Sequence, residues 1–166
     1  DALALACGLE VENGIVVDAF TRTSDPDIFA IGDVTAHPNG HYKRRLRLEN
    51  VQNAMDQAKV AALAICGQPE AYDAVPWFWS DQFDLKIQIV GLTADADQVV
   101  VRHAPDEGRF AVAYLKDGVL IALDAVNAPK DFMQARKLIP ANARPDLTKL
   151  GDPGVPLRDT LEATGT

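Results

Sequence analysis

The hydrophobic pattern of the chain changes character once, between residues 68 and 75, and this change limits the folds open to it. Before it, a continuous apolar run and a long stretch of three- and four-residue periodicity are typical of an α/β unit. After it, apolar and polar residues alternate, as in antiparallel strands that bury one face. The pattern therefore predicts an α+β chain with one unit over residues 1–72 and a second over residues 73–166.

The first unit begins with turn signals around two short extended runs. Asn13 and Gly14 separate two alternating runs within residues 9–18, which predicts a small β-hairpin because both residues tolerate positive φ. Residues 28–31 form a short apolar run, and we expect a strand buried on both faces, as in a parallel sheet. Residues 34–48, which contain proline and glycine, are predicted to form a loop.

The strongest helix signal lies between Asn50 and Gly67. Asn50 is a good N-cap, and Gly67 is a typical helix end. Apolar side chains recur between them at helical spacing: Val51, Ala54, Met55, Ala58, Ala62 and Ile65. The outer face is predicted to carry Gln52, Asp56 and Lys59. Within this chain alone, we expect the apolar helix face and the edge of the preceding strand to be left uncovered.

The second unit is dominated by alternating runs. Asp117 and Gly118 predict a hairpin turn between the last two of them. The predicted strands are residues 85–90, 99–102, 110–116 and 119–126, and the predicted helices are residues 131–139 and 157–163. We therefore expect an antiparallel sheet of about three to five strands with one or two helices.

The charge of the chain argues against two classes of partner. Sixteen basic and 24 acidic residues give a net charge of −8, which disfavours nucleic acid or an anionic membrane. No apolar run approaches the roughly 20 residues that cross a bilayer. Residues 34–48 lack acids but carry Lys43, Arg44, Arg45 and Arg47. This stretch is either a solvated loop or a docking site for an anion or an acidic protein.

Cysteine and histidine spacing indicates neither a disulfide framework nor a metal site. Cys7 and Cys66 are far apart and belong to no CxxC pattern, so we expect small buried side chains. His37 and His41 are four residues apart, but the proline and glycine between them oppose the helix that a zinc-binding pair needs. The chain opens without a basic signal-peptide start, and a cytoplasmic location is the expectation.

Gly32 and Asp33 follow the strand predicted over residues 28–31. At the carboxyl end of a strand in a parallel sheet, this pair places a carboxylate where open α/β folds bind ligands, and the glycine allows close approach. Such a carboxylate can bond a sugar-like hydroxyl. Gly-Asp is also common in simple turns, so the residues alone leave both interpretations open.

Two segments carry a resemblance to a known family. Residues 23–33, TSDPDIFAIGD, resemble the second flavin-binding motif of the FAD-dependent pyridine-nucleotide oxidoreductases. Residues 77–82, WFWSDQ, are similar to the start of the C-terminal domain in one branch, the NADH-dependent ferredoxin reductases. That branch includes the putidaredoxin-reductase type, which serves cytochrome P450 systems and ring-hydroxylating dioxygenases. The resemblance continues through residues 47–59 and 124–127 and covers nearly the whole chain.

The resemblance implies both a fold and contacts with FAD. Residues 1–72 would form the C-terminal end of an FAD-binding α/β domain, followed over residues 73–166 by an antiparallel-sheet reductase C-terminal domain. Asp33 would bond the ribityl chain of FAD. Gly32 would allow the close approach, and Val34 would lie beside the ribityl chain through its backbone.

Three further residues are implied to meet the flavin ring. Val51 and Gln52, at the start of the helix, would face its pyrimidine end. Independently of the resemblance, a helix N-terminus carries partial positive charge and free N–H donors, so it favours the negative charge of a reduced flavin. Trp79 would border the isoalloxazine on the acceptor side and serve electron transfer. A core or interface tryptophan is the alternative.

The resemblance also assigns a partner to the basic residues. Ferredoxins are acidic, so a [2Fe–2S] ferredoxin would need a positive surface near the flavin. The residues of this surface would be Lys43, Arg44, Arg45, Arg47 and Lys59, with Arg136 and Lys137 as further candidates. Lys59 stands where relatives often carry arginine, which keeps the charge but loses the bidentate fork.

A glycine-rich GxGxxG loop is absent from the sequence. The family needs one for the ADP half of FAD and one for NADH. The resemblance therefore implies that NADH is bound mainly by an upstream part, and that this chain is the C-terminal portion of an NAD(P)H-dependent flavoenzyme, inactive by itself. Two alternatives stay open: a non-catalytic, truncated interaction module, and a flavoprotein of the NADH oxidase or apoptosis-inducing-factor type.

Overall fold

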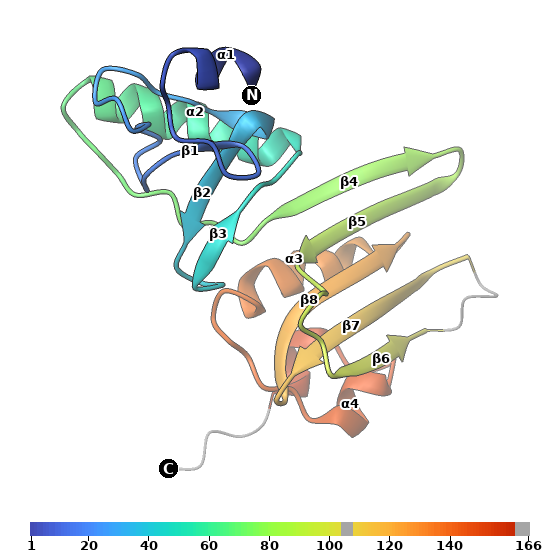
Figure 1. The fold of residues 1–166 in the computed structure, drawn as a ribbon. Helices are drawn as coiled ribbons and strands as arrows, with labels where there is room; N and C mark the ends of the chain where they lie inside the picture. The colour runs from blue at the N-terminus through green and yellow to red at the C-terminus, as the bar shows by residue number, and fades with distance from the viewer. Residues whose placement is uncertain (104–107, 162–166) are drawn as a thin grey trace, which may run out of the picture. The chain divides into compact units, whose positions relative to one another are not determined.

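A computed structural model describes residues 1–103 and 108–161 of the chain. The chain divides into two compact units, the first ending at Pro76 and the second beginning at Trp77 (Figure 1). The connector expected over residues 68–75 contains neither helix nor strand. Each unit is built around its own sheet.

The first unit contains a small mixed sheet with the strand order β1-β2-β3. β1 (Ile15–Val16) pairs in parallel with β2 (Thr35–Asn39), and β2 pairs antiparallel with β3 (Arg44–Leu46). The prediction of a loop over residues 34–48 is therefore wrong. Its two halves pair as a hairpin, which satisfies backbone groups that a loop would leave to solvent.

Asn13 and Gly14 form the expected tight turn, with φ angles of 48° and 125°. The predicted hairpin is reduced to one antiparallel bridge between Val11 and Ile15, because the outgoing strand pairs with β2 instead. Glycine is required in this turn, since a Cβ on Gly14 would lie 2.8 Å from the carbonyl oxygen of Val34.

The apolar run at residues 28–31 is not the predicted strand buried on both faces. Among the described residues it makes a single bridge, between Phe29 and Arg22. Ile28 and Ile31 are 37% and 41% exposed. A strand is buried on both faces only where neighbouring strands and helices complete the sheet, and the described residues supply neither at this edge. Because no strand forms at residues 28–31, the uncovered strand edge expected there is replaced by a partly exposed apolar segment.

The long helix α2 (Val51–Ile65) has the predicted bounds and ends. The Asn50 side chain accepts a hydrogen bond from the backbone N–H of Asn53 at 2.8 Å, as an N-cap should. Gly67, at a φ of 75°, follows the last turn. Both ends of the helix are therefore set by residues that the sequence identifies.

The orientation of α2 departs from the prediction at Gln52, which is 6% exposed and not on the outer face. The buried positions are Gln52, Asn53, Gln57, Val60, Ala61 and Ala64. Val51, Met55 and Ile65 from the apolar stripe are 56%, 68% and 68% exposed. The helix turns a largely polar face inward because that face bonds backbone groups of the preceding turn, and its uncovered apolar face is confirmed.

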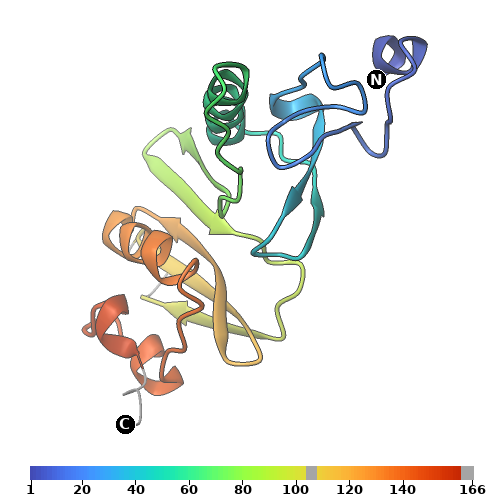
Figure 2. The ribbon, with the colours of Figure 1, turned by 90° about the vertical axis from the view of Figure 1, so that its left-hand side faces the viewer.

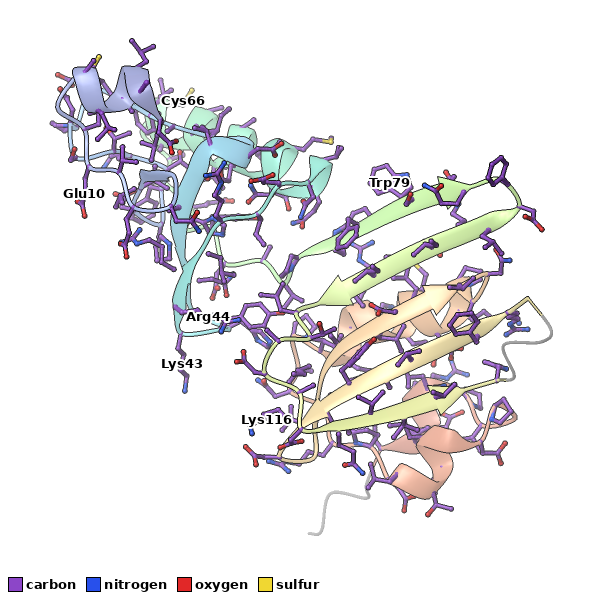
Figure 3. All side chains as sticks on the ribbon, turned by 45° about the vertical axis from the view of Figure 1, so that its right-hand side comes forward. Glu10, Lys43, Arg44, Cys66, Trp79 and Lys116 are labelled. Atoms are coloured by element: carbon purple, nitrogen blue, oxygen red, sulfur yellow. The ribbon has the colours of Figure 1, made fainter. Side chains whose placement is uncertain are left out.

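A short helix that the sequence did not predict, α1 (Ala2–Ala6), opens the chain. Cys7 follows α1 and Cys66 follows α2, and both thiols are free and exposed. The expectation of buried cysteines is therefore wrong, because each cysteine lies just beyond the last packed turn of a helix. Figure 3 shows Cys66 at the end of α2.

In the described part of the second unit, five strands form a sheet in the order β4-β5-β8-β7-β6, with every neighbouring pair antiparallel. The strands are β4 (Trp77–Gln82), β5 (Leu85–Gly91), β6 (Gln98–Arg102), β7 (Phe110–Lys116) and β8 (Val119–Val126). The predicted antiparallel sheet is confirmed. The sequence analysis missed β4, whose bulky run WFWSDQ does not alternate in polarity.

The turns of this sheet follow local chemistry. Asp117 and Gly118, at φ 49° and 77°, form the predicted turn between β7 and β8. Phe83, at φ 56°, lies in the turn between β4 and β5. Its side chain is fully exposed, so this turn places an apolar ring in solvent.

Short helices accompany the sheet. They are α3 (Pro129–Leu138), α4 (Leu147–Gly151) and the 3₁₀ turn η3 (Leu157–Thr160). α3 agrees with the helix predicted over residues 131–139. The helix predicted over 157–163 is represented by η3, and residues 162 and 163 lie outside the described part of the chain.

Small side chains in the central strands let α3 pack closely on one face of the sheet (Figure 2). The core side chains with 0 to 2% exposure include Ala111, Ala113, Leu115, Ala122, Leu123, Ala125, Phe132, Ala135 and Ile139. Burying one large apolar side chain is worth about 1.5–3 kcal/mol. This core stabilises the scaffold that carries Trp79 on β4.

Candidate functional site

The Gly32–Asp33 turn is built on hydrogen bonds with α2. The residues Gly32–Val34 form a single 3₁₀ turn, η1, which packs against α2. The backbone N–H of Gly32 donates to Gln57 Oε1 at 2.7 Å, and the same oxygen lies 3.0 Å from Thr35 Oγ1. Gln57 and Thr35 are both fully buried, so this small network fixes the turn in a low-dielectric setting.

Glycine at position 32 is required mainly by the backbone conformation. Gly32 has a φ of 75°, which L side chains rarely adopt. A Cβ built there would lie 3.4 Å from the Cβ of Ala54 in α2, at the near limit of ordinary van der Waals contact. A side chain at this position would therefore strain the turn and leave no free space between the turn and the helix.

Asp33 is exposed at the end of this turn. Within the described residues its carboxylate has no hydrogen bond or ion pair, whereas its backbone carbonyl accepts from Arg47 Nε at 3.1 Å. The backbone is thus anchored while the carboxylate stays available. An exposed, unpaired carboxylate on a fixed turn can accept hydrogen bonds from ligand hydroxyls.

The start of α2 lies against the same turn. Val51 is largely exposed, and the buried Gln52 side chain donates to Asp56 Oδ2 at 2.5 Å. The Gln52 amide is therefore engaged within the helix. What this end presents to a ligand is the partial positive charge of its first N–H groups. The structure brings Gly32, Asp33 and Val34 together with Val51 and Gln52 in one region.

Trp79 belongs to the second unit and lies on β4. Its ring is 44% exposed and projects from the strand (Figure 3). Because side chains two residues apart share one face of a strand, Trp79 stacks on Trp77, with ring centroids 5.7 Å apart and an interplanar angle of 27°. The guanidinium of Arg136 in α3 lies 4.2 Å from the Trp77 ring centroid. The cation, the partly buried ring of Trp77 and the exposed ring of Trp79 therefore form a stack.

The basic residues expected to dock a partner divide into two groups. Lys43 and Arg44 are exposed at the turn of the β2–β3 hairpin (Figure 3). Arg45 braces the unit, because its Nη1 donates to the carbonyls of Val17 and Ala36 at 2.9 and 3.0 Å. Arg47 bonds the backbone of the Asp33 turn.

Arg47 is also paired with an acid. Its Nε lies 3.1 Å from Glu49 Oε1. Lys43, Arg44 and Arg45 are therefore the exposed cations of this stretch, and Arg45 and Arg47 also bond backbone carbonyls.

Lys59 lies in different electrostatic surroundings. It lines a hollow of about 250 Å³ together with three acidic residues, Asp56, Glu70 and Asp73. The Asp73 carboxylate is already used, since it accepts from the backbone N–H groups of Gly40 and His41 at 2.8 and 3.2 Å. Lys59 is exposed, but its charge faces local acids as well as solvent.

The two histidines are not brought together as a metal site. His37 is 1% exposed, and its ring packs against Tyr72 with centroids 5.0 Å apart, whereas His41 packs against Tyr42. Burial, aided by the charge of Arg45, lowers the pKa of His37 to about 4. Over the ranges that the structure describes, no group of three His, Cys, Asp or Glu side chains could hold a metal ion.

Two functional features escaped the sequence analysis. Gln57, which bonds the Gly32 turn, has no local signal that separates it from a surface glutamine. Arg102 is 1% exposed and pairs with Asp131 in α3 at 3.5 Å. The run QVVVR does not alternate in polarity, so the sequence alone did not show that Arg102 faces inward, where a charged residue must find buried partners.

The chain matches two family models. Residues 77–161 match the family described as Reductase C-terminal, and residues 1–58 match the family described as Pyridine nucleotide-disulphide oxidoreductase. The chain is 47% identical over 162 residues to a 5,5'-dehydrodivanillate O-demethylase ferredoxin reductase subunit from Sphingobium sp., covering 97% of this chain and 39% of that protein. It is 39% identical over 161 residues to a putidaredoxin reductase from Pseudomonas putida, covering 97% of this chain and 38% of that protein.

Solved structures show the same likeness. The reductase in a covalent putidaredoxin reductase–putidaredoxin complex has a TM-score of 0.89 at 39% identity, covering 96% of this chain and 38% of that one. A ferredoxin reductase for the CYP199A2 system of Rhodopseudomonas palustris has a TM-score of 0.90 at 40% identity, covering 97% and 40%. The chain thus spans about two fifths of the length of the relatives that it matches.

Proposed function

Because this chain belongs to the Reductase C-terminal family, in the ferredoxin-reductase branch of the pyridine nucleotide-disulphide oxidoreductases, we propose that it is the C-terminal part of a flavoprotein reductase. The whole protein would pass electrons from NADH through FAD to a [2Fe–2S] ferredoxin that serves a P450 or a ring-hydroxylating dioxygenase. The division of labour would follow the two units, with residues 1–72 completing an FAD-binding domain and residues 73–166 forming the reductase C-terminal domain.

The observation that carries the proposal is the Asp33 turn. The residues present fit FAD in three ways: an unpaired exposed carboxylate, a glycine that lets the turn approach α2, and a helix N-terminus beside it. Asp33 would accept hydrogen bonds from the ribityl hydroxyls, with Gly32 and Val34 shaping the backbone beside them. Val51 and Gln52 would direct the positive end of α2 at the pyrimidine edge of the ring.

Bound there, FAD supplies the capacity to accept a hydride from NADH and to release electrons singly. The chain's own residues position and tune it. The N-terminus of α2 favours negative charge at the pyrimidine edge, which makes reduction easier. The proposed role of Trp79 is to border the ring, and its stack with Trp77 and Arg136 limits how far its own ring can move.

The ferredoxin would dock on exposed positive charge. Lys43 and Arg44 support this proposal best, because they are exposed at a hairpin turn in a chain whose net charge is −8. Lys59 remains part of the proposed dock. Arg45 and Arg47 would contribute mainly through the long-range field, since their side chains brace the unit. The proposed location is the cytoplasm, which the two free, exposed thiols support.

The test is reconstitution of the full-length protein with FAD, NADH and a [2Fe–2S] ferredoxin. We expect steady reduction of the ferredoxin, and flavin absorbance that is retained through gel filtration. Asp33→Ala should weaken FAD binding, so that the variant loses its flavin at a smaller dilution than the parent protein. Asp27→Ala changes an exposed aspartate of the same segment and should retain the flavin as the parent protein does.

Two outcomes would contradict the proposal. A flavin-loaded protein that oxidises NADH without reducing any ferredoxin would favour an oxidase of the NADH oxidase or apoptosis-inducing-factor type. A full-length protein that binds no flavin would favour the non-catalytic interaction module.

In the part of the chain that the structure describes, no helix is long and apolar enough to cross a membrane.

A further inference from the structure

The second unit contains a cavity of about 400 Å³ to which neither the sequence nor the proposed function assigns a role. Its described wall comes from the end of β6, residue 109 just before β7, the first half of α3, the segment 153–156 and the start of η3. This volume lies within the range of about 300–1,000 Å³ that small-molecule sites occupy. The cavity is therefore large enough for a small ligand.

The charge of the lining is strongly one-sided. Among the described residues, four permanent cations and one histidine line the cavity, against a single carboxylate. The charged and titratable lining residues are Arg102, His103, Arg109, Lys130, Asp131 and Arg158. In a chain with a net charge of −8, this concentration of cations in a concave site is the reverse of the average surface.

Arg102 organises the buried side of this cavity. It is 1% exposed, and its guanidinium donates to the carbonyls of Leu150 and Val155, the latter at 2.8 Å. Its Nη2 also lies 3.5 Å from Asp131 Oδ1. One side chain therefore ties β6 to α3, α4 and the segment that follows α4. Arg102 Nε is buried and has no hydrogen-bond partner within the described residues.

The carboxylate of Asp131 is engaged by two neighbouring side chains. Asp131 lies 3.5 Å from Arg102 Nη2 and 3.2 Å from His103 Nε2, and it is 5% exposed. Asp131 therefore neutralises little of the positive charge of the rim residues Arg109, Lys130 and Arg158. Arg109 and Lys130 are exposed and form no ion pair with any described residue. Within the described ranges, the one ion pair of Arg158 is with Asp159, exposed at 3.5 Å and screened by solvent.

We propose that this cavity, between β6, α3 and η3, binds a small phosphate-bearing anion. At the rim, the guanidinium groups of Arg109 and Arg158 and the ammonium group of Lys130 can donate to the several oxygens of a phosphate group. The buried Arg102 adds a positive charge to the wall of the cavity. The concavity distinguishes this surface from the exposed Lys43–Arg44 turn, because a cavity of this size admits a small molecule and not the convex face of a protein.

The rim cations supply the variants for a test, because their side chains can be changed without touching the buried Arg102. The triple variant Arg109→Gln, Lys130→Gln, Arg158→Gln removes three rim charges. A matched triple, Lys86→Gln, Lys137→Gln, Lys149→Gln, removes three exposed charges of the same unit that do not line the cavity. Unfolding temperatures of both triples should stay close to that of the parent protein.

Binding is measured by titration calorimetry of the full-length, flavin-loaded protein with inorganic pyrophosphate at constant ionic strength. We expect saturable binding that the rim triple weakens about tenfold or more and that the matched triple changes less than about twofold. Succinate, a dicarboxylate, should bind at least about tenfold more weakly than pyrophosphate.

Four results would overturn the inference. No saturable binding of pyrophosphate to the parent protein would remove the site. Equal weakening by the two triples would mean that only the general field of the surface is sensed. Equal affinity for succinate and pyrophosphate would remove the assignment to phosphate. If the rim triple instead impaired ferredoxin reduction while pyrophosphate did not bind, this surface would be a protein dock and the small-anion inference would fail.

Discussion

The two units bury different kinds of side chain around their proposed functional residues. In the first unit the buried set around the Gly32 turn is polar, with Thr35, Asn53 and Gln57 all at 0% exposure. In the second unit the buried set is mainly alanine and leucine with Phe132, and its buried charged residues, Arg102 and Asp131, pair with each other. Hydrogen bonds therefore define the geometry of the first unit, and apolar packing supplies the stability of the second.

Both units leave large apolar side chains exposed, and in the second unit these include Phe83, Val99 and Val101. The first unit leaves Met55 and Ile65 of α2 both 68% exposed, and its apolar run at residues 28–31 unpaired on most of its length. The second unit closes its core between the sheet and α3. The comparison teaches that a well-defined local site can exist in a unit whose apolar surface is incompletely covered by this chain.

The largest expected effect tests the apolar core of the second unit. Phe132→Ala should lower the free energy of unfolding by about 3–5 kcal/mol, because it removes a side chain that is 2% exposed and leaves a cavity. Met133→Ala, at the neighbouring exposed position, should change it by no more than about 0.5 kcal/mol. Urea denaturation followed by circular dichroism gives both values, and similar losses for the two variants would contradict a closed core.

The next effect tests the polar interior of the first unit through pH. Burial lowers the pKa of His37 from 6.5 to about 4, so the unfolded chain binds a proton first as the pH falls. Neutral His37 therefore costs no stability above pH 6.5. As the pH falls from 6.5 to 4, the free energy of unfolding decreases, and the loss reaches about 3 kcal/mol at pH 4. His37→Phe keeps the ring against Tyr72 and should remove this slope.

The measurement is the free energy of unfolding at a series of pH values between 7 and 4 for both proteins. The difference between them should grow as the pH falls, in favour of His37→Phe. Neither ring nitrogen of His37 has a hydrogen-bond partner within the described residues, so the variant loses no such bond at neutral pH. Parallel profiles would show that His37 is not held neutral in the folded unit.

A smaller effect separates backbone strain from packing at the Gly32 turn. Gly32→Ala and Gly67→Ala place a side chain at the same φ of 75°, and each should lose about 1–2 kcal/mol. Gly67 has open space around it, whereas a Cβ at Gly32 would meet Ala54 at 3.4 Å. Only Gly32→Ala should therefore also weaken flavin retention in the full-length protein. Equal retention in the two variants would place the flavin contact elsewhere.

The smallest expected effect concerns docking. Lys59→Glu should slow ferredoxin reduction on the order of threefold at low salt and flatten its salt dependence, because charges at the rim of an interface act mainly on association. Reduction of a small neutral acceptor should stay unchanged.

Trp79→Ala should slow electron transfer to both acceptors without changing the salt dependence. Stopped-flow traces over a series of salt concentrations separate these results, and equal losses with both acceptors for Lys59→Glu would indicate a structural role.

Local signals in the sequence determined the parts of the fold that depend on a few neighbouring residues. Asn50 and Gly67 set the ends of α2, Asp117-Gly118 sets the β7–β8 turn, and the alternation along β7 sets which of its side chains are buried. The family was also accessible from the sequence, because WFWSDQ and the Gly-Asp motif keep a recognisable order along the chain.

Tertiary structure decided what pairs over long separations. Residues 34–48 became a hairpin, and residues 28–31 found a bridge to Arg22 in place of a sheet. Gln57 turned inward because the N–H of Gly32, 25 residues away, needs an acceptor, and Arg102 was buried because Asp131 and two carbonyls reach it. Such contacts leave little trace in local periodicity, since a buried hydrogen bond is favourable only when the complete fold brings donor and acceptor together out of water.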